Sequence, residues 1–175
     1  MMALPTLSPR LQALFDGLLP GEPVWDVCCD HGYLGIAALR SGNFPEVHFV
    51  DQVPSIIRNL QERLFKSKYP EKIFFHAMDA NTFQAPVGGN LVIAGIGGVN
   101  MIQILQRLNS LDLLKVQRLI LCAHRDDDKL KEWLLCLAAK GPFNFIAEQV
   151  VTERGRSRRV FVLKSDHESN KFHKL

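Results

Sequence analysis

The chain has 175 residues, of which 47% are hydrophobic and 22% charged, with a formal net charge of +3 at neutral pH. A chain of this length buries enough apolar surface to fold as one domain without disulfide or metal cross-links. The longest apolar stretch, residues 91–99, contains three glycines and is too short to cross a bilayer. We therefore expect a cytoplasmic globular protein with no membrane segment and no secretory signal, whose weak positive charge permits an RNA partner.

The four cysteines, Cys28, Cys29, Cys122 and Cys136, include no Cys-x-x-Cys pair. This spacing favours reduced thiols and argues against a disulfide framework or a zinc site. We expect no bound metal. The sequence leaves the oligomeric state open between a monomer and a weak dimer.

Short β-rich runs alternate with helical patterns along the chain. A helix is predicted over residues 8–19, with Ser8 as its N-cap and Pro9 in its first turn. Asp126 is predicted to cap a later helix. The other helices are predicted over residues 33–41, 54–65, 98–108 and 127–139. The strands are predicted over residues 24–28, 47–50, 73–76, 91–94, 118–122, 143–151 and 159–163.

This alternation is typical of a parallel sheet with helices on both faces. The last two strands, joined by residues 153–157, are predicted to form a hairpin. Seven strands with a terminal hairpin match the Rossmann-like sheet of class I methyltransferases, whose last strand inserts antiparallel. We predict one such α/β domain over residues 1–163, with a helix at 7–19 packed on it and a polar, disordered tail over residues 164–175.

The loop after the first strand is the first candidate site, because ligands of open α/β sheets bind beyond the carboxyl ends of the strands. In methyltransferases this loop usually reads acidic-x-Gly-x-Gly-x-Gly, since a backbone without Cβ atoms lets the cofactor approach closely. Here the register gives Asp26, Cys28, Asp30 and Gly32, so only the last glycine is present. Taken alone, the loop is a weak match to an S-adenosylmethionine site.

Three other strand ends support a cofactor site. Asp51 ends the second strand, where a carboxylate can bind a ribose diol, and Asp79 follows the third strand, beside the expected adenine. A glycine run, residues 95–98, follows the fourth strand. Acidic caps and tight turns are the structural alternatives, but four matches in sheet order favour a cofactor site. A dinucleotide fold is disfavoured, because Gly-x-Gly-x-x-Gly is absent.

Several motifs together resemble one known family. They are Leu-Ser-Pro-Arg-Leu at residues 7–11, Asp-His-Gly-Tyr-Leu at 30–34, Ile-Ala-Gly-Ile-Gly-Gly at 93–98, Leu-Ile-Leu at 119–121 and Lys-Glu-Trp-Leu at 131–134. On these motifs the chain resembles the TrmK-type tRNA (adenine-N1)-methyltransferases, which modify the adenine at tRNA position 22. The resemblance covers residues 7–163 and implies S-adenosyl-L-methionine as cofactor and tRNA as partner.

The chain also departs from the family. Members of this family have a sequence similar to Gln-Pro-Asn after the fifth strand, whereas this chain has Cys122-Ala123-His124. They carry a C-terminal helical extension that helps grip tRNA, and we expect the chain to lack it. Two alternatives therefore stay open beside the tRNA enzyme, namely a small-molecule methyltransferase and a non-catalytic module that binds S-adenosylmethionine.

The expected chemistry needs little more than alignment, because the methyl group of a sulfonium is already activated. Adenine N1 carries an in-plane lone pair and attacks without first losing a proton. The Asp/Asn-Pro-Pro-Tyr motif of exocyclic-amine methyltransferases is absent from residues 94–98, which favours ring-nitrogen chemistry. Cys28 and Cys29 are interpreted as small residues of the loop rather than nucleophiles.

Three sets of site residues are predicted. The cofactor-binding set is Asp26, Cys28, Asp30, Gly32, Tyr33, Asp51, Gln52, Asp79, Ala80, Ala94 and Gly95. The catalytic set is Asp30, His31 and Gly95. The RNA-binding set is Arg10, His124, Arg125, Arg154 and Arg156, of which the last two belong to a basic hairpin. Helix capping, local hydrogen bonding, core packing and solubility are the alternative roles for these residues.

Overall fold

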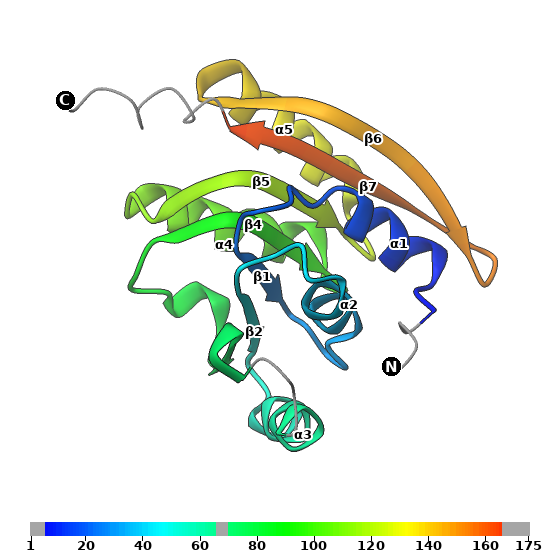
Figure 1. Ribbon diagram of the computed structural model, residues 1–175. Helices are drawn as coiled ribbons and strands as arrows, with labels where there is room; N and C mark the ends of the chain where they lie inside the picture. Colours follow the sequence, from blue (N-terminus) through cyan, green and yellow to red (C-terminus); the bar gives the residue numbers. More distant parts are fainter. Residues whose placement is uncertain (1–5, 66–69, 166–175) are drawn as a thin grey trace.

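A computed structural model describes residues 6–65 and 70–165 of the chain. Within these ranges seven strands form one sheet in the order β3-β2-β1-β4-β5-β7-β6 (Figure 1). Their bounds are β1 (Val24–Val27), β2 (Val47–Asp51), β3 (Ile73–Ala77), β4 (Val87–Ala94), β5 (Leu114–Cys122), β6 (Phe143–Glu153) and β7 (Arg156–Ser165). Strands β1 to β5 are parallel, and β7 runs antiparallel to both β5 and β6. The predicted fold class is confirmed.

Helices cover both faces of the sheet. They are α1 (Pro9–Asp16), α2 (Tyr33–Ser41), α3 (Pro54–Leu64), α4 (Gly98–Ser110) and α5 (Asp127–Lys140), with short 3₁₀ turns η1 (Pro70–Lys72) and η2 (Ala80–Thr82). Along β4, Leu91 and Ile93 pack with α4 and α5, whereas Val92 between them packs with α1, α2 and α3. This alternation follows from the pleat of a strand buried on both faces. No helix of the described residues is long and apolar enough to span a membrane.

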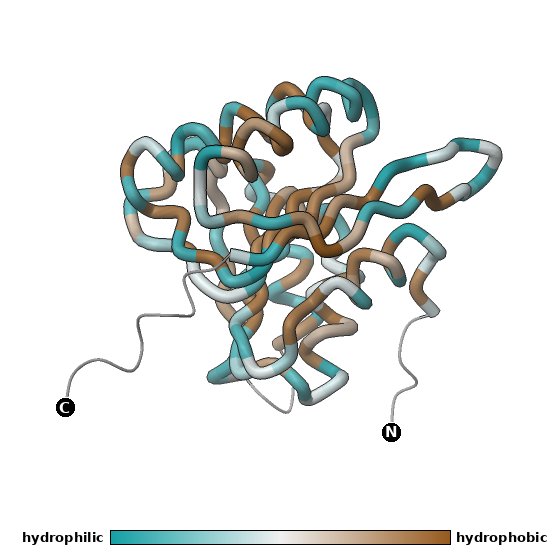
Figure 2. Tube along the Cα trace, turned by 90° about the horizontal axis from the view of Figure 1, so that it is seen from above, coloured by the Kyte–Doolittle hydropathy of each residue, from teal (hydrophilic) through white to brown (hydrophobic). Residues whose placement is uncertain are grey.

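The hydropathy of the residues follows their position in the fold. Figure 2 shows hydrophobic residues concentrated in the central strands and hydrophilic residues on the outer turns and on the projecting hairpin. The segment before β1 is fastened to the sheet by the fully buried Asn90. Its amide nitrogen donates to the carbonyl of Leu19 at 3.0 Å, and its oxygen accepts from the Leu19 amide at 2.6 Å. This pair of hydrogen bonds ties the segment between α1 and β1 to β4.

Three strands begin earlier than predicted, one of them β7, which starts at Arg156 rather than at residue 159. β4 starts at Val87 rather than at residue 91, and β5 starts at Leu114 rather than at residue 118. The early part of β4 contains two glycines, which disfavour strands. The pairing register shifts between Gly89 and Asn90, where Gly89 has a positive φ of 73°. The structure therefore accommodates a β-bulge where the sequence suggested a loop.

Helix ends bear out one predicted cap and correct another. Ser8 is the N-cap of α1, and its hydroxyl accepts from the Leu11 amide at 3.4 Å. Asp126 precedes α5 with a φ of 56°, and its side chain makes no capping hydrogen bond. The Asp126 carboxylate instead pairs with Lys129 at 3.1 Å. The prediction of a side-chain cap at Asp126 was wrong because the residue is left-handed, whereas a capping residue is extended.

The terminal hairpin projects beyond the rest of the sheet (Figure 1). Pairing between β5 and β7 stops at Leu121 and Phe161, while β6 and β7 remain paired out to Glu153 and Arg156. Because β5 ends at the carboxyl edge of the parallel strands, the hairpin projects from that edge. Its turn is two residues, Arg154 and Gly155, both with positive φ, and is shorter than predicted. β7 ends at Ser165, and the rest of the predicted tail, residues 166–175, lies outside the described residues.

Candidate functional site

A cavity of about 520 Å³ opens at the carboxyl edge of the sheet. The exit loops of β1, β2, β3 and β4 line it, together with residues of α1, α2 and α4. In the strand order, β1 is followed by β2 on one side and by β4 on the other. The cavity therefore lies where the strand order reverses, which is where open α/β sheets bind ligands.

The loop after β1 has the backbone conformation of a glycine-rich loop, although it keeps only the last of the three glycines. φ is positive at Cys28 (60°), Asp30 (49°) and Gly32 (66°), the three positions where the usual motif has glycine. A left-handed residue with a Cβ atom costs roughly 1–2 kcal/mol, so neighbouring contacts must hold Cys28 and Asp30 in place. One such contact is the hydrogen bond from the Cys29 amide to the carbonyl of Val50, at 3.2 Å.

Gly32 serves packing rather than the cavity. It is not among the residues that line the cavity. A Cβ atom at this position would come within 2.7 Å of Leu60 and 3.0 Å of Phe49. The glycine therefore lets the start of α2 approach β2 and α3 closely, and this requirement explains the single glycine of the loop.

Asp26 is a buried carboxylate at the base of the loop. It accepts a hydrogen bond from the Gly35 amide in α2 at 3.0 Å. Burial raises the pKa of Asp26 to about 7, with a further contribution from the nearby charge of Asp51, while the Gly35 hydrogen bond opposes the rise. A positively charged ligand in the cavity would favour the ionised form of Asp26.

The acidic residues predicted at the ends of β2 and β3 also line the cavity. Asp51 is buried, and its two oxygens accept from the amides of Asp30, at 3.2 Å, and Val53, at 3.0 Å. Asp79 caps η2 by accepting from the Asn81 amide at 2.9 Å, which places the buried Ala80 against the cavity. As the sequence predicts, these carboxylates lie together at the carboxyl edge of the sheet.

The backbone at the end of β4 is not covered by side chains. Gly95 has a φ of 81°, and no atom lies within 4 Å of the position that a Cβ atom would take. The carbonyl of Gly95 is 2.9 Å from Nδ1 of His124, which must donate to it. The His124 amide donates to the carbonyl of Ile96 at 3.0 Å, so the exit loops of β4 and β5 are bound together.

The catalytic and aromatic candidates at the mouth are exposed. Tyr33 is 45% exposed and is therefore not a core residue. The rings of His31 and Tyr33 are 5.5 Å apart, and the Arg63 guanidinium lies 5.8 Å from the Tyr33 ring centre. Arg63 also donates to the carbonyl of His31 at 2.9 Å. These three side chains form a polar and aromatic rim next to Asp30.

The thiols of Cys28, Cys29 and Cys122 are not activated as nucleophiles, and the described residues form no cluster for a metal ion. Burial raises the pKa of the Cys28 thiol to about 12, with the Asp51, Asp26 and Asp79 carboxylates adding to the rise. Burial likewise raises the pKa of Cys29 and Cys122. These thiols stay protonated at neutral pH and are poor nucleophiles. Within residues 6–65 and 70–165, no group of three or more His, Cys, Asp or Glu side chains is placed to hold a metal ion.

Sequence reasoning missed part of the cavity wall. The additional lining residues include Met78, Asn81, Ile96, Asn100 and Gln103. Asn100 and Gln103 are three residues apart on α4, hence on one helix face, so polar residues just after the glycine run were an available signal. Arg10, predicted as an RNA contact, also lies in the cavity wall.

The remaining RNA candidates lie outside the cavity wall. His124 and Arg125 are exposed at the exit of β5, and Arg154 and Arg156 are exposed at the hairpin turn. All four are at the carboxyl edge of the sheet, on the side where the cavity opens. The structure therefore brings the cofactor candidates other than Gly32 together in one cavity and leaves these basic residues around it.

Comparisons with known proteins place this chain in a family. A family model described as "Methyltransferase domain" matches residues 7–161. Similar solved structures include the Bacillus subtilis m1A22 tRNA methyltransferase TrmK, 23% identical with a TM-score of 0.78, covering 93% of this chain and 68% of that chain. Mycoplasma capricolum TrmK, in complex with S-adenosyl-homocysteine, is 18% identical with a TM-score of 0.78 and coverages of 91% and 69%.

A third structure, Streptococcus pneumoniae Sp1610, is described as a candidate tRNA (m1A22) methyltransferase. It is 26% identical with a TM-score of 0.75, covering 91% of this chain and 71% of that chain. The sequence has no match among curated proteins. The family model spans most of the chain, and the predictions of a class I fold and of a methyltransferase are confirmed. The chain belongs to the methyltransferase domain family.

Proposed function

We propose that the chain is an S-adenosylmethionine-dependent enzyme that methylates N1 of adenine in tRNA. The observation that carries the proposal is the cavity in which acidic side chains from the ends of β1, β2 and β3 face the open backbone of Gly95. Solved neighbours support the same assignment, because they include TrmK enzymes and one structure in complex with S-adenosyl-L-methionine. A tRNA substrate implies a cytoplasmic location.

The cavity divides into parts that match the parts of the cofactor. Asp51 binds the ribose hydroxyls, and Asp79 with Ala80 borders the adenine. Asp26 and Asp30 face the methionyl ammonium, next to the left-handed backbone at Cys28. The remaining proposed cofactor contacts are Tyr33, Gln52, Ala94 and Gly95, which line the cavity. In this proposal the adenosine half lies toward β2 and β3 and the methionyl half toward β1 and β4.

The reaction requires the protein mainly to align the adenine nitrogen with the methyl group of the cofactor. The cofactor supplies an activated methyl group, whose carbon becomes bonded to adenine N1 while the carbon–sulfur bond breaks and its electron pair goes to sulfur. No side chain has to remove a proton from N1. Gly95 offers bare backbone beside the reacting atoms, and Asp30 and His31 orient the base at the mouth of the cavity. The Asp30 carboxylate also stabilises the positive charge that the methylated base acquires.

The basic residues at the carboxyl edge form the proposed RNA surface. Arg154 and Arg156 bind phosphates from the projecting hairpin, and His124 and Arg125 contact the nucleotide near the cavity. The target adenine has to leave its stack to enter the cavity. Tyr33 and His31 at the rim offer rings against which an unstacked base can pack.

Two measurements test the proposal. Calorimetry with S-adenosylmethionine and S-adenosylhomocysteine should give saturable binding, which Asp51→Ala weakens strongly. Transfer of labelled methyl groups should occur to bulk tRNA and not to a pool of small metabolites. Absence of binding at millimolar ligand would remove the cofactor assignment, and labelling of metabolites instead of tRNA would reassign the substrate.

A further inference from the structure

The cavity wall is acidic except at one position. Among the described residues that line the cavity, Asp26, Asp30, Asp51 and Asp79 are carboxylates, and Arg10 is the one arginine or lysine. A ligand with a carboxylate of its own is repelled by four aspartates at close range. Arg10 is therefore the part of the wall where such a ligand can place its negative group.

Arg10 is held in place from the hairpin. Its Nε donates to a Glu153 carboxylate oxygen at 3.4 Å, and the two side chains are only 28% and 26% exposed. The Ser8 hydroxyl, followed by the charge and hydrogen bond of Arg10, lowers the pKa of Glu153, so Glu153 stays ionised. Because Arg10 uses Nε here, its two terminal nitrogens can donate to other acceptors.

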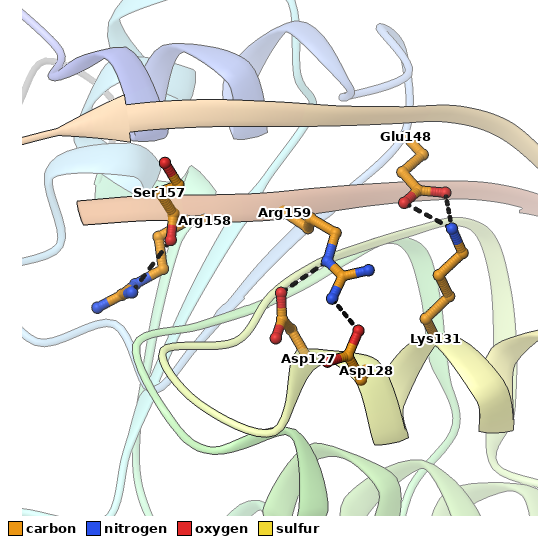
Figure 3. A network of polar contacts seen from close by, with 7 residues as sticks. All are labelled: Asp127, Asp128, Lys131, Glu148, Ser157, Arg158 and Arg159. Atoms are coloured by element: carbon orange, nitrogen blue, oxygen red, sulfur yellow. Dashed lines mark hydrogen bonds and ion pairs between the residues drawn. The ribbon is translucent and has the colours of Figure 1, made fainter.

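The hairpin that carries Glu153 is itself fixed. Arg159 of β7 bonds Asp127 at 2.7 Å and also pairs with Asp128, at the start of α5 (Figure 3). Lys131 of α5 bonds Glu148 of β6 at 2.9 Å. α1 packs against the hairpin as well. Glu153 thus reaches Arg10 from a strand pair braced between two helices.

The position of Arg10 matches one end of the cofactor. Asp51 ends β2 and Asp79 follows β3, so the adenosine half lies at that side of the cavity in the proposed function. Arg10 lies at the opposite side, close enough to the Cys122 thiol at the end of β5 for its positive charge to oppose the rise in the pKa of that thiol. The methionyl half extends in this direction, and it carries both an ammonium and a carboxylate.

We propose that Arg10 binds the carboxylate of the methionyl group and that Glu153 is the positioning residue for Arg10. This inference rests on the proposed function. Asp26 and Asp30 take the ammonium, and Arg10 takes the carboxylate by a charge-assisted, bidentate contact. Arg10 then belongs to the cofactor site rather than to the RNA surface, and the enzyme selects carboxylated over decarboxylated ligands.

The test is calorimetry with S-adenosylhomocysteine and its decarboxylated analogue, on the full chain. The unmodified protein should bind S-adenosylhomocysteine at least about tenfold more tightly. Arg10→Ala should weaken S-adenosylhomocysteine roughly 10- to 100-fold and leave the decarboxylated analogue unchanged. Glu153→Gln should also weaken S-adenosylhomocysteine binding without affecting the decarboxylated analogue, but by a smaller factor. Arg10→Lys should keep part of the affinity that Arg10→Ala loses. Arg58→Ala, on the exposed surface of α3, is the matched control.

The outcomes separate the inference from the proposed function. An equal loss for both ligands in Arg10→Ala, or no loss for either, overturns the role of Arg10. An effect of Glu153→Gln on both ligands alike overturns its positioning role. If the unmodified protein binds neither ligand, the proposed function itself fails. Thermal unfolding of each variant identifies any loss that comes from misfolding.

Discussion

The Asp30 amide donates a hydrogen bond to the Asp51 carboxylate at 3.2 Å, and this contact joins the loop after β1 to the end of β2. The other Asp51 oxygen accepts from Val53 at 3.0 Å. One carboxylate therefore holds two backbone amides, one of which belongs to a residue in the left-handed region. Asp51 shapes the cofactor loop in addition to its proposed contact with the ribose.

Replacing Asp51 by asparagine should weaken both the fold and the site. The amide has one acceptor oxygen instead of two, so one of the two backbone amides loses its partner, at a cost of about 1–3 kcal/mol. We expect a lower Tm and at least about tenfold weaker S-adenosylhomocysteine binding. Asp79→Asn is the matched control for stability, because Asp79 accepts through Oδ1 alone and asparagine keeps that oxygen. Equal Tm values for the two variants would contradict this account.

Cys28 should tolerate glycine but not valine. Its φ of 60° is a conformation that glycine adopts freely and that a β-branched residue strongly disfavours. We expect Cys28→Val to lose about 1–3 kcal/mol of stability and much of its cofactor affinity, whereas Cys28→Gly keeps both. Denaturant unfolding and calorimetry measure the two effects. A fully stable valine variant would show that the loop is not constrained at this position.

The sequence was sufficient to predict the sheet, the order of its strands and helices, and the acidic strand ends. Alternating apolar runs define buried strands, and Asp51 and Asp79 directly follow such runs. The glycine count was misleading at the first loop, because Cys28 and Asp30 adopt the same backbone conformation that glycine would. Hydrogen bonds from residues distant in sequence hold that conformation, and no local pattern reveals them.

Contacts between distant elements explain the other differences. Arg10 appeared to be a surface residue of the first helix, yet its partner Glu153 lies 143 residues further along the chain. Arg159 lies on the same hairpin as the predicted RNA contacts Arg154 and Arg156, but Asp127 and Asp128 pair with it (Figure 3). Tertiary contacts of this kind decide which arginines remain available to a ligand.

Asp26→Asn should change the pH dependence of stability. The pKa of Asp26 rises from 3.8 to about 7 on folding, so the folded state binds more protons than the unfolded state between these values. This group therefore contributes stability that is fully present below about pH 4 and lost as the pH rises through about 7. Asparagine removes that loss and can still accept from Gly35. We expect the variant to be more stable at pH 8 by about 2–4 kcal/mol, an upper range set by about 1.4 kcal/mol per pKa unit.

The measurement is the free energy of unfolding at pH 5 and pH 8 for both proteins. Taking the difference between variant and unmodified protein cancels groups that titrate equally in both, such as His48 and His76, whose pKa values burial lowers. The variant should also bind S-adenosylhomocysteine more weakly at pH 8, because it cannot offer a carboxylate to the ammonium. A difference that does not change with pH would refute the assignment of this pKa.

The hairpin arginines should control RNA affinity alone. Replacing Arg154 and Arg156 by alanine should weaken tRNA binding and reduce the slope of log affinity against log salt by about 2, one for each lost phosphate contact. Cofactor affinity should not change, because neither side chain lines the cavity. Filter binding across a salt series, with Arg58→Ala as control, tests this. An unchanged slope would place the RNA surface elsewhere.

The central claim is methyl transfer to N1 of adenine in tRNA. It is tested most directly by incubating the protein with labelled S-adenosylmethionine and unmodified tRNA, digesting the RNA to nucleosides and identifying the labelled product by mass spectrometry. The account predicts label in 1-methyladenosine, with little or none for Asp51→Ala. Label in a different nucleoside, or no labelled RNA from a protein that binds the cofactor, would contradict it.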